Sequence, residues 1–441
     1  MVGAGPAGIY AADILSRSLA VRIDLIERLP APYGLVRYGV APDHPRIKQI
    51  IAALHKILER GDVRLLCNVD FGVDLTLADL HRFYDAVVFA TGAIRDAGLA
   101  IPGIELPGSF GAADLVSWYD GHPDAPRTWP LEAEHVAVLG AGNVALDVAR
   151  ILSKHPNDLL HTEIPDAVHE CLKASPVTDV HIFARRGPAQ AKFTPLELRE
   201  LGRVPGVDVV VYPEDFEFDE GSMAAIHSSN QTKQVVKTLT DWTLREPDLA
   251  VRRHIHLHFL HRPVAVLGTD RVTGLRTERM VLAGDGSVAG SGRTRDWPVE
   301  AVYRAVGYFG SPLAGLPFDT VAGVIPNREG RVVGGDGECL PGVYATGWIK
   351  RGPVGLIGHT KSDASETVRH LVSDLDDLPR APERDPGAVV ALLVGRGVAP
   401  VQWAGWMLLD AYEQSLGAAR DRDRIKVVPR EEMLEITRGS R

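Results

Sequence analysis

The sequence predicts an α/β protein with two Rossmann-like domains built on parallel sheets, the second domain inserted in the first. Strand-like and helix-like segments alternate through the first hundred residues, as in a parallel sheet covered by helices. Two glycine-rich loops each precede a helix-like segment. A strand, a glycine and a helix near the C-terminus then resume the first domain. The expected boundaries are residues 1–96 and 313–441 for the first domain and 97–312 for the second.

Composition narrows the function classes. The chain has 441 residues, 45% hydrophobic and 24% charged, and a formal net charge of −9, which argues against non-specific nucleic-acid binding. Its three cysteines, Cys67, Cys171 and Cys339, form no CxxC pair, so we expect reduced thiols and no metal site. No apolar run approaches the roughly 20 residues of a membrane helix, and a glycine loop stands where a signal peptide would. We expect a cytoplasmic monomer.

The elements follow the order of such a fold. In the first part, the periodicity predicts a helix over 9–17, a strand over 21–27, a helix over 47–60 and a strand over 86–91. A Gly- and Pro-rich stretch from Asp96 to Gly108 is typical of a crossing linker. Later segments are expected as follows: a strand, loop and helix over 135–152, strands over 180–184, 299–306 and 342–346, and a helix over 362–375.

The first loop has the GxGxxG spacing of a dinucleotide site. Gly3 makes the tight turn, Gly5 lets the backbone approach a pyrophosphate, and Gly8 allows the helix to pack on the strand. The helix N-terminus then directs its amides at the phosphates. Glu27 ends the next strand nineteen residues after Gly8, at the spacing of a carboxylate that binds a ribose diol. Together these residues predict a dinucleotide site.

The second loop favours NADP over NAD. It spans residues 140–145 and has Ala145 at the third glycine position. The following strand ends in Arg185 and Arg186 instead of an acid. Two guanidinium groups suit the dianionic 2′-phosphate of NADP. The alternative interpretation is a solvated arginine pair without a ligand.

Hydride transfer between two bound dinucleotides needs no nucleophile, metal or acid–base pair from the protein, because the nicotinamide and the flavin carry out that step themselves. The missing cysteine pair excludes a disulfide reductase, which needs a redox dithiol. These observations indicate an oxidoreductase that transfers electrons between two cofactors.

Longer strings carry a family resemblance. They are GLVRYGVAPDHP from Gly34, GNVALDVARIL from Gly142, ARRGPAQAKFTPLELREL from Ala184 and GWIKRGPVGLIG from Gly347. With them the chain resembles the adrenodoxin-reductase-like ferredoxin–NADP reductases over almost its whole length. The resemblance implies FAD in the first domain, NADP(H) in the second, and electrons that pass from NADPH through the flavin to a small iron–sulfur protein such as a ferredoxin.

The resemblance also implies contact residues. On the FAD side they are Gly3, Gly5, Ala7, Gly8, Glu27, Leu35, Trp348, Gly355, Leu356 and Ile357. On the NADP side they are Ala141, Gly142, Asn143, Val144, Arg185, Arg186, Glu197 and Gly355. His44 and Glu200 match polar residues that influence nicotinamide placement and proton management in the family. The alternative for His44 is a capping or satisfied buried histidine between two prolines, and that for Glu200 is a helix-surface carboxylate.

A basic stretch is expected to dock the partner. Ferredoxins are usually acidic, so a chain of net charge −9 needs a local basic patch. Arg245, Arg252 and Arg253 lie in a stretch that resembles the docking region of the family. The alternative is a solvated loop.

Two departures from the family are visible. Only Met1 and Val2 precede the first loop, so the central strand is short, and we expect the reading frame to continue upstream with an apolar segment that raises stability and FAD retention. The family's arginine near the NADP pyrophosphate falls on Ala97, and Arg95 is a candidate substitute.

Two other functions stay open at this point. One is an NADPH diaphorase or quinone reductase that uses the same flavin without a protein acceptor. The other is a non-catalytic redox sensor whose cofactor state gates a partner.

Overall fold

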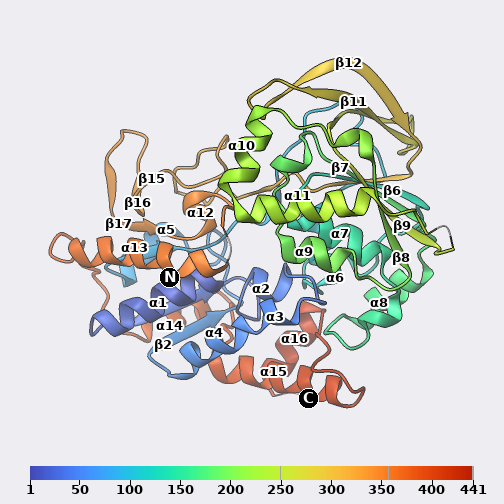
Figure 1. The fold of residues 1–441 in the computed structure, drawn as a ribbon. Coiled ribbons are helices and arrows are strands. Elements are labelled where there is room, and N and C mark those ends of the chain that lie inside the picture. Colours follow the sequence, from blue (N-terminus) through green and yellow to red (C-terminus); the bar gives the residue numbers. More distant parts are fainter. Residues whose placement is uncertain (249, 356, 440–441) are drawn as a thin grey trace. The chain divides into compact units, whose positions relative to one another are not determined.

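The computed structural model describes residues 1–248, 250–355 and 357–439. The chain forms two compact units. Unit 1 comprises Met1–Arg95, Asp120–Asp124 and Tyr308–Arg441, and unit 2 comprises Asp96–Tyr119 and Ala125–Gly307. In Figure 1 the blue and orange-to-red segments belong to unit 1 and the green and yellow segments to unit 2. The predicted insertion of one domain in the other is therefore confirmed.

Unit 1 is built on strands that meet on either side of Val2. They are β1 (Ile23–Glu27), β2 (Val63–Cys67), β3 (Val87–Phe89), β15 (Asn327–Arg328), β16 (Arg331–Val333) and β17 (Cys339–Ala345), and β14 (Tyr308–Phe309) lies apart in a two-stranded sheet. β1 pairs with β2 and β3 with β17, both in parallel, and β17, β16 and β15 pair antiparallel. Val2 bridges Ile26 on one side and Phe89 on the other. The glycine loop therefore begins between β1 and β3.

Helices cover the sheet of unit 1 on two sides. They are α1 (Pro6–Ser18), α2 (Leu35–Tyr38), α3 (Pro45–Lys48), α4 (Ile50–Glu59), α5 (Leu77–Phe83), α12 (Trp348–Arg351), α13 (Ile357–Ser373), α14 (Ala388–Gly395), α15 (Trp403–Ala418) and α16 (Arg430–Thr437). One core joins α1, α4, α13, α15 and α16 to β1 and β2. A second core joins α5 and α14 to β3 and β17. Among the described helices, none is long and apolar enough to cross a membrane.

Unit 2 contains a six-stranded parallel sheet of order β5-β13-β6-β7-β9-β8. Its strands are β5 (Ser109–Gly111), β6 (His135–Leu139), β7 (Asp179–Phe183), β8 (Val207–Val211), β9 (Arg253–His258) and β13 (Ala301–Arg304). Its helices are α6 (Ala112–Tyr119), α7 (Asn143–Ser153), α8 (Asp166–Ala174), α9 (Pro195–Leu201), α10 (Glu220–Ser228) and α11 (Asn230–Thr243). β4 (Arg95–Asp96) lies where the chain passes between the units.

A second, antiparallel layer was not predicted. It is a three-stranded sheet of β10 (His261–Leu267), β11 (Gly274–Leu282) and β12 (Val288–Trp297). Val266, Leu275 and Trp297 from this layer pack with Leu139 and Phe183 of the parallel sheet in one apolar cluster. The layer therefore covers one face of β6 and β7.

The helices and strands predicted from the sequence are present in the structure, with small shifts in their bounds. The helix expected over 47–60 is two helices, α3 and α4, which meet at Gln49, the C-cap of α3 and the N-cap of α4. Leu54, Ile57 and Leu58 are buried, as the predicted apolar face requires. The two parallel sheets confirm the predicted α/β class.

Candidate dinucleotide sites

The three glycines of the first loop have different structural roles. Gly3 has a φ of 106°, and a Cβ there would lie 2.5 Å from the carbonyl oxygen of Ala90. A Cβ on Gly8 would lie 2.0 Å from the carbonyl oxygen of Gly3, so the helix packs directly against the start of the loop. Gly5 instead has an open side, with only the Cα of Gly34 within 4 Å, at 3.9 Å. Gly5 is also the N-cap of α1, so the open side leads to the helix N-terminus where a pyrophosphate fits.

Glu27 lies beside this loop. One carboxylate oxygen accepts a hydrogen bond from the Ala4 amide at 2.9 Å, and the other accepts one from the Leu29 amide at 3.1 Å. Burial raises the pKa of Glu27, and the two backbone donors oppose that rise. The carbonyl of Ala4 accepts from the Tyr33 amide at 2.8 Å, which places Leu35, the first residue of α2, close to the same loop.

We expect the substitution Glu27→Ala to weaken FAD binding by about one to two decades, because a charge-assisted hydrogen bond contributes roughly 1.5 to 3 kcal/mol. The measurement is the dissociation constant of FAD for the deflavinated protein. Because Glu27 also orders Ala4 and Leu29, Glu27→Gln is the matched variant: it keeps an acceptor but loses the charge. FAD retention at the wild-type level in both variants would contradict a ribose contact.

The turn after β17 approaches the first loop from the other side. Gly347 has a φ of 74°, and a Cβ there would lie 2.6 Å from the Cβ of Ala7. Trp348, the next residue, is half-buried and begins α12. Unit 1 thus brings the turn that carries Trp348 to the loop. Gly355 is exposed with a φ of 87°, Leu356 lies outside the described residues, and Ile357 is the first residue of α13.

Asp363 was missed by sequence reasoning. From α13 its buried carboxylate accepts hydrogen bonds from the Thr346 hydroxyl, at 3.1 Å, and the Gly347 amide, at 2.5 Å. The ammonium group of Lys350 lies 3.1 Å from its other oxygen. The residue holds the turn that precedes Trp348. A lone acid in an amphipathic helix carries no sequence signal of this role.

The second loop has the same construction in unit 2. Gly140 has a φ of 140°, and a Cβ there would lie 2.2 Å from the carbonyl oxygen of Ala305. Gly142, the N-cap of α7, has nothing within 4 Å of that position, so its side of the loop is open. The Ala141 carbonyl accepts from the Lys192 amide at 2.8 Å, and the Asn143 side chain accepts from the Thr194 amide at 2.9 Å. Val144 follows within α7. The segment before α9 therefore fixes the loop.

Arg185 and Arg186 follow the strand next to this loop. The Gly140 amide donates to the Phe183 carbonyl at 3.0 Å, which joins the loop to the end of β7. Arg185 is exposed and Arg186 half-buried. Within the described part of the chain, no carboxylate forms an ion pair with either guanidinium group. Two cations without a protein anion suit a phosphate dianion.

The remaining coenzyme and catalytic candidates differ in burial. Glu197 on α9 is buried, and its carboxylate lies 3.9 Å from the guanidinium group of Arg150. Glu200 is half-buried on the same helix. His44 in unit 1 is 6% exposed at the N-cap of α3, and its side chain does not cap that helix. The predicted capping alternative for His44 therefore has no support.

The three docking candidates are not equivalent. Arg245 is exposed and its guanidinium group lies 5.6 Å from the ring centre of Trp242. Arg252 is exposed as well. Arg253 is half-buried, and it donates to the carbonyls of Ser153 and Lys154 at 3.2 and 2.9 Å, at the C-terminal end of α7. Only Arg245 and Arg252 present their charge to solvent.

Ala97, where the family has an arginine, and its candidate substitute Arg95 lie where the chain first passes from unit 1 to unit 2. Arg95 is exposed. The Ala97 amide donates to the Gly307 carbonyl at 2.8 Å. No described contact directs Arg95 to the second loop, so its role as a substitute stays a prediction.

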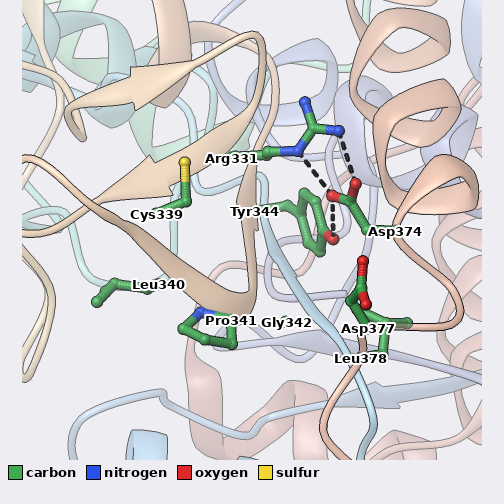
Figure 2. Close-up of a pocket in the computed structure, with 9 residues that line it drawn as sticks. All are labelled: Arg331, Cys339, Leu340, Pro341, Gly342, Tyr344, Asp374, Asp377 and Leu378. Atoms are coloured by element: carbon green, nitrogen blue, oxygen red, sulfur yellow. Dashed lines mark hydrogen bonds and ion pairs between the residues drawn. The ribbon is translucent and has the colours of Figure 1, made fainter.

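A cavity of about 260 Å³ lies elsewhere in unit 1 and contains none of the candidate residues. Figure 2 shows that the Arg331 guanidinium group and the Tyr344 hydroxyl both donate to Asp374. The cation of the cavity is therefore already paired with a carboxylate, which leaves it unsuited to the phosphates of a dinucleotide. It is lined by Arg331, Cys339, Leu340, Pro341, Gly342, Tyr344, Asp374, Asp377 and Leu378.

Comparison with known proteins agrees with two dinucleotide sites. A family model described as pyridine nucleotide-disulphide oxidoreductase matches residues 1–190. Over its full length the chain is 40% identical to NADPH-ferredoxin reductase FprA of Mycobacterium tuberculosis, of which it covers 98%. It is 38% identical to the mitochondrial NADPH:adrenodoxin oxidoreductase of Homo sapiens, covering 99% of this chain and 91% of the human protein.

A solved structure also matches this chain over almost its whole length. The structure of Mycobacterium tuberculosis FprA in complex with NADPH matches with a TM-score of 0.91 at 39% identity. The match covers 99% of this chain and 98% of that one. The fold is therefore shared over the whole chain.

Proposed function

We propose a function on the premise that the chain belongs to the family of NADPH–ferredoxin and NADPH–adrenodoxin reductases. It transfers electrons from NADPH through FAD to a small iron–sulfur protein of the ferredoxin type. The observation that carries this proposal is the pair of glycine loops, each with an open side at a helix N-terminus. When bound, the nicotinamide supplies a hydride and the flavin passes electrons on singly.

The protein's contribution is to bind and orient the two cofactors. In unit 1 the open side of Gly5, the carboxylate of Glu27 and the turn at Gly347 support an FAD site around the first loop. In unit 2 the open side of Gly142 and the unpaired charges of Arg185 and Arg186 support an NADP site. Since the three cysteines are free thiols, no dithiol of this chain serves as the electron acceptor.

We also propose roles for two polar residues. His44, which is buried without capping a helix, and Glu200 would together influence nicotinamide placement and proton management. Both roles come from the resemblance to the family. The pH profile of flavin reduction in single variants tests them: His44→Gln and Glu200→Gln should each change it, and Glu432→Gln, on α16, should not.

The substitutions Arg245→Ala and Arg252→Ala together should slow ferredoxin reduction about tenfold at low salt, because exposed cations steer an acidic partner. Flavin reduction by NADPH should be unchanged. The effect should vanish at 1 M salt, where the Debye length falls to about 3 Å from about 10 Å at 0.1 M. Stopped-flow rates at several salt concentrations measure this, with Arg293→Ala, an exposed arginine of the same unit, as control. A double variant with the parent's salt dependence would place docking elsewhere.

The two alternatives give different results in the same assay. A diaphorase or quinone reductase would turn over with a quinone at a rate independent of salt and show no saturation with ferredoxin. A redox sensor would not bleach its flavin rapidly with NADPH. A cytoplasmic location stays a prediction.

A further inference from the structure

Residues 33–38, here called the 33–38 segment, lie against the first glycine loop of unit 1. The Tyr33 amide donates to the Ala4 carbonyl at 2.8 Å. Gly34 faces Gly5 at close range, because a Cβ on Gly34 would lie 3.1 Å from the Cα of Gly5. Since the proposed FAD site lies at the open side of Gly5, the 33–38 segment forms one wall of that proposed site.

Tyr33 has a backbone conformation that residues with a Cβ rarely adopt. Its φ is 84°, in the left-handed region that favours glycine. Gly34, the next residue, has a φ of 50°. A positive φ costs an aromatic residue free energy, and it persists only where the surrounding structure imposes it. Contacts from elsewhere in unit 1 must therefore hold the 33–38 segment in place.

Helix α15, near the C-terminus, supplies these contacts. Trp406 is fully buried and packs edge-on against Tyr33, with ring centres 5.7 Å apart. The guanidinium group of Arg37 lies 5.2 Å from the ring centre of Trp406. One turn and a half further along α15, Oε1 of Glu413 accepts a hydrogen bond from Nη2 of Arg37 at 2.6 Å. Both ends of the 33–38 segment therefore rest on α15.

The ion pair of Arg37 and Glu413 is almost completely buried. Their side chains are 3% and 0% exposed. Removing two charges from water costs about as much free energy as their attraction returns, so neutral side chains of similar size often give an equally stable or more stable fold. Stability alone therefore does not explain these charges. A charge-assisted hydrogen bond is strong and directional, and it can fix one position of the segment that bears the arginine.

A second buried contact holds the end of α2. This helix has only four residues, so its last carbonyl groups have no partner within the helix. The ammonium group of Lys426, a side chain that is 1% exposed, donates to the Arg37 carbonyl at 2.6 Å and to the Asp120 carbonyl at 2.9 Å. The next residue, Val427, donates its amide to Oε1 of Glu413 at 3.0 Å. Lys426 and Glu413 therefore belong to one buried network around Arg37.

We propose that Glu413 and Lys426 are positioning residues for FAD: through Arg37 they hold the 33–38 segment in the strained conformation that shapes the site for the diphosphate. This inference rests on the proposed function, because it requires FAD at the first loop. The two residues act through the segment and not by touching the cofactor. If the segment without them adopts the binding conformation only about a tenth of the time, the apparent dissociation constant of FAD rises about tenfold.

The test measures the dissociation constant of FAD and the melting temperature of the deflavinated full-length protein. Arg37→Met combined with Glu413→Gln removes both charges, so neither is left buried alone, and the glutamine still accepts from the Val427 amide. The double variant should melt at or above the parent's temperature, yet its dissociation constant for FAD should rise about tenfold or more. Lys426→Met should also raise that constant. Arg37→Lys keeps a cation beside Glu413 and should bind FAD nearly as the parent does.

Arg331→Met combined with Asp374→Asn is the matched control, because it removes an ion pair of the same unit that joins β16 to the residue after α13. It should bind FAD as the parent does. If the Arg37 and Glu413 double variant does not fold, Lys426→Met decides the question.

Two results would overturn this inference and leave the proposed function intact. One is equal FAD affinity in the parent and the folded variants. The other is a loss of affinity confined to variants whose deflavinated form melts below the parent. A parent protein that does not bind FAD would instead overturn the proposed function, and this inference with it.

Discussion

Replacing both Arg185 and Arg186 with alanine should lower kcat/KM for NADPH about 100-fold or more and leave that for NADH nearly unchanged. Hydrogen bonds to a charged group contribute roughly 1.5 to 3 kcal/mol each, so losing two costs at least about 3 kcal/mol. Every 1.4 kcal/mol corresponds to about a factor of ten. NADH has no 2′-phosphate and so loses no partner. The effect should therefore appear as a fall in the ratio of kcat/KM for NADPH to kcat/KM for NADH.

Stopped-flow flavin reduction with each coenzyme measures this ratio. The matched control is Arg203→Ala, because Arg203 is an exposed arginine of the same unit that follows α9. It should change neither coenzyme. Equal losses with NADPH and NADH in the double variant would mean that the arginine pair supports the fold and not the phosphate.

Much of this site follows from local sequence. Gly3, Gly8 and Gly140 occupy positions where a Cβ would collide with backbone, and such positions recur at fixed spacing in a glycine loop. The ends of β1 and β7 place Glu27 and Arg185 beside the loops because neighbouring parallel strands end at one edge. Spacing along one strand–loop–helix unit is enough to predict these contacts.

The remainder depends on contacts between distant segments. Asp363 reaches Gly347 only because α13 returns to the sheet after a turn. The ion pair of Arg37 and Glu413 joins side chains that are 376 residues apart in the chain. Arg253 shows the converse: its charge in a basic stretch suggests docking, yet it caps α7. A single sequence contains no period or spacing that reports such long-range pairs.

Acid should destabilise unit 2 through a cluster of buried histidines. Beneath the antiparallel layer of unit 2, His181 stacks on His256 with ring centres 4.4 Å apart, and its Nδ1 lies 3.0 Å from Nε2 of His258. Burial lowers the pKa of His181 to about 3 and that of His261 to about 4. Burial also lowers the pKa of His256 and His258. The charges facing them include Asp179, which opposes the shift of His181 and His256, and Arg295, which adds to that of His181, His258 and His261.

Because the folded chain binds fewer protons than the unfolded one, this stabilisation is complete above the ordinary histidine pKa of about 6.5. It declines as the pH falls from there toward 3 to 4. At pH 5, His181 alone should reduce the free energy of unfolding by about 2 kcal/mol, since 1.5 units below 6.5 at about 1.4 kcal/mol each gives that loss. A loss of this size is a large part of the 5 to 15 kcal/mol typical of a domain. Acid should therefore destabilise unit 2.

Urea unfolding of the protein between pH 7.5 and 4.5, followed by a probe in unit 2, measures this dependence. His181→Phe keeps an aromatic ring in the stack but cannot take up a proton. It should reduce the slope of the unfolding free energy against pH by up to about 1.4 kcal/mol per unit, the contribution of one proton. His227→Gln, at an exposed position, should leave the slope unchanged. If the unfolding free energy of His181→Phe had the same slope against pH as that of the parent, the folded protein would protonate His181 as readily as the unfolded chain does. The buried histidine stack would then play no part in acid sensitivity.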